Sequence, residues 1–206
     1  MRETNTSKNL LLIFTRNPTF GKVKTRLAKD IGDQAALNIY NFLLAHTAKI
    51  CSPLSYDKAV YYSEEISKND IWDTAIFQKK IQIGEDLGER MKNAFAEGFN
   101  SGYSKIIIIG SDLYDIETKD LEMAFEVLND HEVVIGPAED GGYYLLGMTQ
   151  LRETLFKNKN WGTSTVLQET INELNKSNYK LLEKRNDVDV YSDIKDQPAF
   201  FHFFKA

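Results

Sequence analysis

The chain has 206 residues, of which 42% are hydrophobic and 27% are charged. This length suits one domain, and the composition is that of a globular protein, which excludes disordered, collagen-like and fibrous chains. The formal net charge of −5 excludes the basic surplus typical of proteins that bind nucleic acid or anionic membranes, so any site for an anion must be local.

Cysteine content and hydropathy favour a cytoplasmic protein without a membrane span. The single cysteine, Cys51, cannot form an intrachain disulfide, which suits a reducing compartment. The longest apolar runs are far shorter than the roughly 18 residues of a membrane-spanning helix. Residues 1–9 are polar, so we expect a short disordered lead rather than a signal peptide, followed by one domain over residues 10–206.

Apolar periodicity predicts strands that alternate with helices along the chain. Residues 10–14 and 105–109 are continuous apolar runs, as expected of central parallel strands covered on both faces. Shorter predicted strands cover residues 59–62, 77–83, 133–135 and 143–146. Amphipathic spacing predicts helices over residues 33–50, 87–99, 119–129 and 164–174. This pattern indicates a single α/β domain, in which ligands bind at the carboxyl ends of parallel strands.

The segment after the first predicted strand is strongly basic. Residues 16–29 include five basic side chains and no acidic one, although acids outnumber bases in the whole chain. Pro18 and Gly21 favour a turn, and a basic loop ahead of a helix supplies donors for phosphate oxygens. We therefore predict a polyphosphate site formed by Arg16, Gly21, Lys22, Lys24 and Arg26. The alternative is a solvated basic turn.

An acidic residue follows the second long apolar run. Asp112 comes directly after Gly110 and Ser111, just past the end of the predicted strand. A carboxylate at this place can bind Mg²⁺ or Mn²⁺ that bridges nucleotide phosphates. The alternative is that Asp112 or Asp115 only caps the following turn or helix.

Asp140 is the candidate catalytic residue. It precedes Gly141 and Gly142, two glycines that permit close approach of the backbone to a ligand. In that position Asp140 would deprotonate or orient an acceptor hydroxyl. The alternative is a Gly-Gly hairpin that leads into the strand over residues 143–146.

Asp86 and Arg90 are weaker candidates for ligand binding. Asp86 begins a predicted helix and Glu89 follows three residues later, which resembles a capping box and places Arg90 near the helix start. Capping alone would explain the two acids, so a ligand role for Asp86 or Arg90 is the lesser alternative.

The last part of the chain contains two further features. Asp187 and Asp189 alternate, so on an extended segment they share one face and either complete a metal site or lie at the surface. Residues 198–204 are strongly aromatic, which favours docking on the core, with a dimer contact as the alternative.

In this order, the motifs resemble a bacterial family of domain-of-unknown-function proteins. The segments that carry the resemblance are residues 14–18, 21–27, 84–91, 110–113, 136–147, 161–163 and 187–189. The family is described as glycosyltransferase-like and as associated with radical-SAM/selenodomain proteins. It is similar to the GT-A superfamily of nucleotide-diphospho-sugar transferases, which also contains molybdenum-cofactor and phospholactate nucleotidyltransferases.

The resemblance implies a single three-layer α/β/α domain with a mainly parallel mixed sheet. It also implies Asp112 as the metal-binding acid, Asp189 as a second ligand, Mg²⁺ or Mn²⁺ as the cofactor, and a phosphate loop formed by Arg16, Lys22, Lys24 and Arg26. The motif after residue 109 has one acid where many sugar transferases have Asp-x-Asp, which is more like nucleotidyltransferases.

Three functions remain open. The first is a metal-dependent glycosyltransferase-like enzyme with a nucleotide-diphosphate sugar as donor and a small-molecule acceptor. The second is a nucleotidyltransferase that uses an NTP and a phosphorylated or hydroxylated acceptor and releases pyrophosphate. The third is a nucleotide-binding protein without catalysis. None of them requires nucleic acid or a membrane as partner, and we expect a monomer or homodimer.

Overall fold

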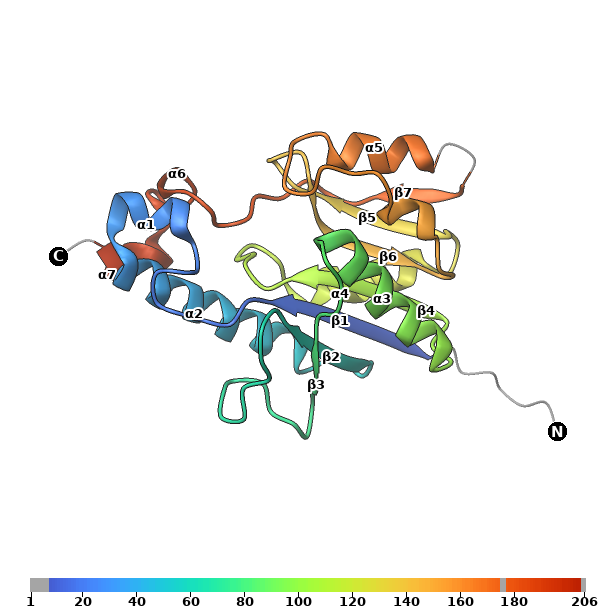
Figure 1. The fold of residues 1–206 in the computed structure, drawn as a ribbon, viewed down its shortest axis with the longest axis horizontal. Coiled ribbons are helices and arrows are strands. Elements are labelled where there is room, and N and C mark those ends of the chain that lie inside the picture. Colours follow the sequence, from blue (N-terminus) through green and yellow to red (C-terminus); the bar gives the residue numbers. More distant parts are fainter. Residues whose placement is uncertain (1–7, 175–176, 205–206) are drawn as a thin grey trace.

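The apolar runs form the strands of a central sheet, and the amphipathic segments form helices on both of its faces (Figure 1). The structure, a computed structural model, describes residues 8–174 and 177–204. In chain order its elements are β1 (Asn9–Thr15), α1 (Thr25–Ile31), α2 (Asp33–Cys51), β2 (Asp57–Tyr62), β3 (Gln78–Ile81), α3 (Leu87–Asn100), β4 (Lys105–Gly110), α4 (Thr118–Val127), β5 (Val133–Pro137), β6 (Tyr143–Met148), the 3-10 helix η1 (Glu153–Phe156), α5 (Val166–Glu173), β7 (Tyr179–Leu181), α6 (Tyr191–Ile194), the 3-10 helix η2 (Pro198–Phe200) and α7 (Phe201–Phe204).

The sheet is mixed and mainly parallel, as predicted. Within the described residues it has seven strands in the order β3-β2-β1-β4-β6-β5-β7. β1 lies inside the sheet, beside the central strand β4, and pairs in parallel with β2 and β4, so that Leu12 lies opposite Ala59 on one side and Ile108 on the other. β6 is antiparallel to both β4 and β5. The carboxyl ends of β1 and β4 therefore meet at one edge of the sheet, where we expect a ligand.

Alternation along the strands divides the core into two layers. Leu11 and Ile13 face one side of the sheet and pack with residues of α2 and α4. Leu10 and Leu12 face the other side and pack with residues of α3 and η1. Because successive strand residues point to opposite faces, a continuous apolar run can fill both layers at once. The three-layer α/β/α architecture is thus confirmed.

A third cluster lies at one end of the molecule, where α1, α6 and α7 gather beside α2 (Figure 1). Phe200 is fully buried there, against α1 and α2 residues that include Leu27 and Leu43. Phe42 of α2 meets the Phe200 ring edge-on, with 5.5 Å between the ring centroids. The expectation that the aromatic C-terminal segment docks on the core is confirmed.

Some predictions need adjustment. Helix α1 occupies part of the segment that we expected as a basic loop, and the short elements β7 and α6 were not predicted. Of the expected disordered lead, residues 1–7 lie outside the described residues, while Asn9 is the first residue of β1. Within the described part of the chain, no helix is long and apolar enough to cross a membrane.

Candidate functional site

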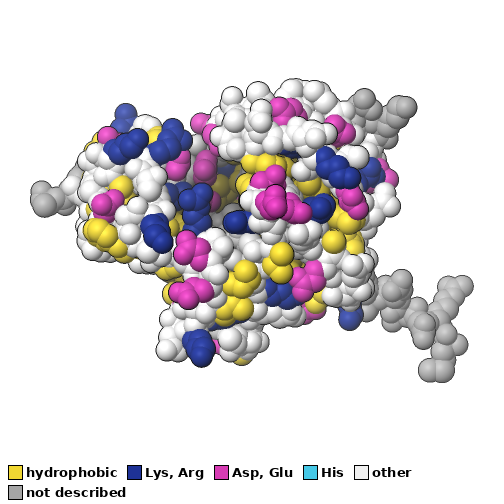
Figure 2. Space-filling model, in the orientation of Figure 1, with side chains coloured by type: hydrophobic (Ala, Val, Ile, Leu, Met, Phe, Trp, Pro, Cys, Tyr) yellow, Lys and Arg dark blue, Asp and Glu magenta, His cyan; other side chains and the backbone are white. Residues whose placement is uncertain are grey.

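The candidate site lies in a hollow beside the end of the molecule that carries α1, α6 and α7 (Figure 2). Figure 2 shows Lys and Arg side chains next to Asp and Glu side chains in this hollow. The hollow leads to a cavity of about 220 Å³, which is lined by Phe14, Leu87, Met91, Ile108, Ile109, Gly110, Asp112, Leu113, Ala138, Asp140, Gly142, Tyr143, Tyr144, Trp161, Gly162, Thr163, Val166 and Asp187. Three of the predicted site residues, Asp112, Asp140 and Gly142, therefore meet in one cavity.

A buried polar network holds the ends of β1 and β4 together next to this cavity. The Ser111 hydroxyl donates to Oγ1 of Thr15 over 3.1 Å. The Tyr40 hydroxyl of α2 accepts from the backbone N–H of Arg16 and donates to its carbonyl, at 2.9 and 3.1 Å. Since each buried hydroxyl has a partner, the network fixes the positions of the residues that follow the two strands.

Asp112 forms an ion pair with Lys24. The Lys24 ammonium lies 2.8 Å from Oδ2 of Asp112, and the Lys24 side chain is only 6% exposed. Burial would raise the pKa of Asp112, but the charge and hydrogen bond of Lys24 outweigh it and hold the pKa below its usual range. Asp112 is therefore ionised at neutral pH and does more than cap a turn.

Lys24 has a strained backbone conformation. Lys24 precedes the first residue of α1 and has a φ of 48°, in the left-handed region that residues with a side chain rarely adopt. Burial would lower the pKa of the Lys24 ammonium, but Asp112, Asp189 and Asp187 raise it above its usual range. The acidic surroundings thus hold a charged ammonium at this position.

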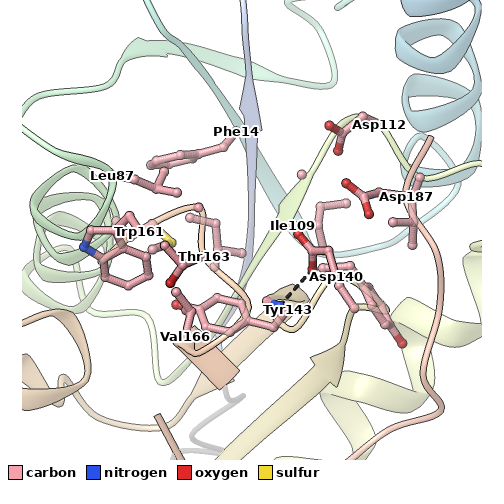
Figure 3. A pocket seen from close by; sticks show the side chains of 18 residues that line it. Phe14, Leu87, Ile109, Asp112, Asp140, Tyr143, Trp161, Thr163, Val166 and Asp187 are labelled. Carbon is pink, nitrogen blue, oxygen red and sulfur yellow. Dashed lines mark hydrogen bonds between the residues drawn. The ribbon is translucent and has the colours of Figure 1, made fainter. Parts of the chain in front are cut away.

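Backbone hydrogen bonds place Asp187 next to Asp112 and Asp140. The N–H of Arg185 donates to the carbonyl of Pro137 over 3.0 Å, and the N–H of Val188 donates to the carbonyl of Asp112 over 3.2 Å. Figure 3 shows the carboxylates of Asp112 and Asp187 on the same side of the cavity, with Asp140 below them. Burial, followed by the negative charge of Asp112, raises the pKa of Asp187 to about 6.

The burial of Asp187 and its closeness to the charge of Asp112 predict that Asp187→Asn stabilises the ligand-free protein above pH 6. A carboxyl with a raised pKa binds its proton more tightly when folded, so its contribution to the free energy of unfolding is full below its ordinary pKa of 3.8 and is lost as the pH rises through about 6. We expect a higher Tm for Asp187→Asn than for the wild type at pH 7.5 and equal values at pH 4, measured by thermal melts across this range.

The control for this prediction is Asp189→Asn. The Asp189 carboxylate already lies 2.5 Å from the guanidinium of Arg26, so its removal relieves no repulsion and we expect no gain in Tm. A Tm difference between Asp187→Asn and the wild type that stays constant with pH would contradict the prediction.

Asp140 lies in the turn between β5 and β6. Its Oδ1 accepts from the N–H of Gly142 over 2.8 Å, and the N–H of Ala138 donates to the carbonyl of Gly142 over 3.0 Å. The alternative of a hairpin is correct for the backbone, and the same hairpin directs Asp140 into the cavity (Figure 3). Gly141 has a φ of 91° and packs against the backbone of Ser164. The close approach that this glycine permits is therefore to another part of the chain and not to a ligand.

The predicted phosphate loop is exposed at three of its four basic residues. Arg16, Lys22 and Arg26 have exposed side chains, and Gly21 has the positive φ, 70°, of a turn. Arg26 is paired with Asp189. Arg16 also lines a second cavity, of about 300 Å³, together with residues of the loop after β2. Asp189, which we expected as a second metal ligand, is outside the lining of the site cavity.

Asp86 and Arg90 have structural partners at the start of α3. The Asp86 carboxylate accepts from the N–H of Glu89 over 2.8 Å, as expected of an N-cap. The Glu89 carboxylate accepts from the N–H of Glu85 rather than from that of Asp86, so the reciprocal bond of a capping box is shifted by one residue. Nε of Arg90 donates to the carbonyl of Gly84 over 3.0 Å. Neither residue lines the site cavity.

The apolar wall of the cavity was not predicted. It combines Phe14 from β1, Leu87 from α3, and Tyr143, Trp161 and Val166 (Figure 3). The helical spacing of Leu87 predicted that it packs in the core. The residue is instead 44% exposed, because the start of that helix face lines the cavity. Nothing in the local pattern of Trp161, or of Val166 at the start of α5, indicates that this part of the chain packs beside Tyr143 of β6.

The acidic residues of the site provide two neighbouring carboxylates for a cation, but not a complete set of protein ligands. Among the described residues, no three His, Cys, Asp or Glu side chains are close enough together to form a metal site by themselves. Asp112 and Asp187 face one another as a pair. Divalent cations of the Mg²⁺ type often use one or two carboxylates and take their other ligands from water and phosphate.

A family model described as "Uncharacterized protein conserved in bacteria (DUF2064)" matches residues 48–163, which is more than half of the chain. A search of the curated proteins found no match. Among solved structures, a "putative nucleotide-diphospho-sugar transferase" from Desulfovibrio desulfuricans G20 is 28% identical, with a TM-score of 0.85 over 96% of this chain and 94% of the other.

More distant solved structures share the fold. A cytidylyltransferase from Leptospira borgpetersenii is 13% identical, with a TM-score of 0.59 over 97% of this chain and 88% of the other. Rv0371C from Mycobacterium tuberculosis H37Rv, in complex with manganese, is 10% identical, with a TM-score of 0.57 over 91% of this chain and 96% of the other. At these identities the likeness shows the architecture and leaves the chemistry to be argued from the site.

Proposed function

Given that the chain belongs to the DUF2064 family, we propose that it is a transferase whose donor is a nucleotide-diphosphate sugar. The observation that carries this proposal is the meeting of Asp112, Asp140 and Asp187 in one cavity, directly beside the basic loop after β1. The likeness to the "putative nucleotide-diphospho-sugar transferase" supports the same class of donor.

In this proposal the basic loop binds the phosphates of the donor. Arg16, Lys22 and Arg26 are exposed on the loop and on the first turn of α1, where an anion can approach them, and Arg26 is also paired with Asp189. Guanidinium and ammonium groups form charge-assisted hydrogen bonds with phosphate oxygens. The buried Lys24 adds a fixed positive charge at the bottom of the loop, next to Asp112.

Asp112 and Asp187 would hold Mg²⁺ or Mn²⁺. Burial and then the charge of Asp112 raise the pKa of Asp187, and a divalent cation would neutralise the two neighbouring carboxylates, so the residues fit such an ion. We place Asp187 ahead of Asp189 in this role because only Asp187 lines the cavity. When bound, the ion would supply charge stabilisation to the phosphates of the leaving group.

Asp140 would act on the acceptor. Its Oδ1 is engaged by the N–H of Gly142, which orients the carboxylate toward the cavity and leaves Oδ2 for a ligand. A hydroxyl of the acceptor that donates to Oδ2 would be aligned for attack on the sugar. It would pass its proton to Asp140 as its oxygen bonds to the sugar and the bond between the sugar and the nucleoside diphosphate breaks. Asp140 is thus our candidate catalytic residue.

Nucleotidyl transfer from an NTP is the second candidate function. It is favoured by the strand-end motif, in which Asp112 is followed by Leu113 and Tyr114 rather than by a second acid two residues on. The density of basic residues in the loop also suits a triphosphate and its pyrophosphate leaving group, which have more negative charge than a diphosphate sugar.

A thermal-shift screen tests this proposal. NTPs, NDPs and nucleotide sugars are each added with and without Mg²⁺ or Mn²⁺, since a ligand of the native state raises the Tm. A ligand at 100 times its Kd stabilises by about 2.7 kcal/mol, which is roughly 5–10 °C for a domain of this size. We expect such a shift with a nucleotide sugar and metal together.

Other results of the screen would point elsewhere. A shift confined to NTPs with metal, followed by pyrophosphate release, would favour nucleotidyl transfer. A shift that is the same with and without metal would contradict the role of Asp112 and Asp187 and would favour a protein that binds nucleotides without catalysis.

A further inference from the structure

The Asp112 carboxylate, which the proposed function assigns to a cation, already has a positive partner in the chain. Its Oδ2 accepts from the Lys24 ammonium over 2.8 Å, and the Lys24 side chain is only 6% exposed. Its Oδ1 is folded over Gly110, where a Cβ would lie 2.9 Å from it. A divalent cation that enters the cavity beside Asp187 (Figure 3) must therefore compete with Lys24 for Asp112.

Lys24 can give up this partner only at a cost. Among the described residues, Asp112 is the only carboxylate within 4.0 Å of the Lys24 ammonium, and Asp187 and Asp189 act on it from farther away. A cation that displaced it would leave the ammonium buried, unpaired and next to a second positive charge. Because removal of one partner from a buried ion pair is strongly unfavourable, we expect the protein without a nucleotide to bind Mg²⁺ or Mn²⁺ weakly.

A diphosphate changes this balance. Its oxygens accept charge-assisted hydrogen bonds from an ammonium, so Lys24 can exchange the carboxylate for a phosphate. The same diphosphate supplies oxygen ligands to the cation, whose ligand set the described acidic residues do not complete. Arg16 is exposed at the end of β1, and its charge also acts on Asp112. Cation and diphosphate thus each remove an obstacle to the binding of the other.

We propose that Lys24 makes the binding of the cation conditional on the donor, so that the site takes a divalent cation as its complex with a diphosphate and not alone. This inference rests on the proposed function, because it takes the cation to bind at Asp112 and the phosphates to bind at the basic loop. It adds an order to that function: Lys24 holds Asp112 until the diphosphate arrives, which keeps free cations out of the cavity.

Titration of the full chain with Mn²⁺ at pH 7.5, without any nucleotide, tests this proposal. The electron paramagnetic resonance signal of hydrated Mn²⁺ reports the free ion, so the Kd is measured without turnover. We expect a Kd above about 1 millimolar for the wild type and a Kd at least about fivefold lower for Lys24→Met, in which Asp112 has lost its ammonium. Lys29→Met is the control: it removes the same charge from the exposed last turn of α1, and its Kd should stay within about twofold of the wild type.

The stability of the variants is followed alongside the titration. Lys24→Met leaves a buried carboxylate without its partner, so its Tm should lie below that of the wild type and should rise when Mn²⁺ is added. Lys24→Asn is a second variant, since asparagine adopts the left-handed backbone of position 24, with its φ of 48°, more readily than most residues. Both variants should show the tighter binding of Mn²⁺.

Thermal melts with inorganic pyrophosphate, a diphosphate without a base or a sugar, test the coupling itself. In the wild type, Mn²⁺ and pyrophosphate together should raise the Tm by more than the sum of their separate shifts. In Lys24→Met the excess over that sum should be smaller, because the cation no longer has to displace an ammonium.

This proposal would be overturned by additive shifts in the wild type, by a wild-type Kd for Mn²⁺ below about 1 millimolar, or by Kd values of the Lys24 variants within about fivefold of it. Equally tight binding by Lys29→Met would also overturn it, since net charge alone would then explain the effect. If a nucleotide sugar with metal raises the Tm but the Lys24 variants bind Mn²⁺ like the wild type, the proposed function stands and the role of Lys24 fails. If Mn²⁺ binds none of these proteins even with pyrophosphate, the cation role of Asp112 and Asp187 fails as well.

Discussion

Asp112→Asn is expected to abolish donor turnover while the fold is retained. The substitution removes the charge that, with Asp187, would hold the divalent cation, and charge stabilisation of a phosphate leaving group contributes several kcal/mol to such reactions. We expect at least a 100-fold loss of turnover with the donor identified by thermal shift, together with loss of the metal-dependent part of that shift.

The fold should survive because asparagine keeps an oxygen where Lys24 needs an acceptor. Lys24 lies 2.8 Å from Oδ2 of Asp112 and also feels the charges of Asp187 and Asp189. The far-ultraviolet circular dichroism spectrum should therefore match that of the wild type.

Two matched variants complete this experiment. Asp187→Asn should lose turnover in parallel with Asp112→Asn, whereas Asp189→Asn, outside the cavity lining, should keep most of it. If Asp189→Asn is as inactive as Asp112→Asn while Asp187→Asn is active, the second ligand is Asp189. Full activity of Asp112→Asn would eliminate the metal role altogether.

Among the substitutions proposed here, Gly141→Ala is expected to cause the largest loss of stability. Position 141 has a φ of 91°, and a Cβ there would lie 2.2 Å from the carbonyl oxygen of Ser164, which is a backbone atom and cannot rotate away. The left-handed backbone costs about 1–2 kcal/mol for a residue with a side chain, and the overlap adds about 1–3 kcal/mol. Thermal melts should show a Tm lower by roughly 5–15 °C.

The adjacent glycine provides the control. A Cβ at Gly142 would meet Oδ1 of Asp140 at 3.2 Å, and its φ lies outside the left-handed region. Gly142→Ala should therefore cost less than about 1 kcal/mol. Equal Tm values for Gly141→Ala and the wild type would mean that the turn after β5 and the loop around Ser164 separate without cost.

The order of strands and helices was predictable because the central strands are covered on both faces. The continuous run at residues 105–109 can only be buried in that way, and Asp112 is exposed to a ligand because it follows the end of that strand. The edge strand β7 could not be predicted, since it has only three residues, of which two are exposed, and contains no apolar run.

The choice between Asp187 and Asp189 depends on contacts that are distant in sequence. On an extended segment the two carboxylates are equivalent by alternation. The bond between Val188 and the carbonyl of Asp112, and the pairing of Asp189 with Arg26, separate them, and both involve partners more than 70 residues away. The ion pair of Lys24 with Asp112 is likewise a property of packing, since only the folded chain brings these two groups together.

The segment that supplies Asp187 is anchored at both ends. On one side, Arg185 is bonded to the turn after β5, and on the other, Ile194 and Phe200 are buried against α1 and α2. The segment that contains Asp187 is thus fixed to the sheet at one end and to α1 and α2 at the other. If the aromatic end of this segment came loose, Asp187 would move away from Asp112, so a substitution far from the cavity would weaken the cation binding that we propose before it unfolded the sheet.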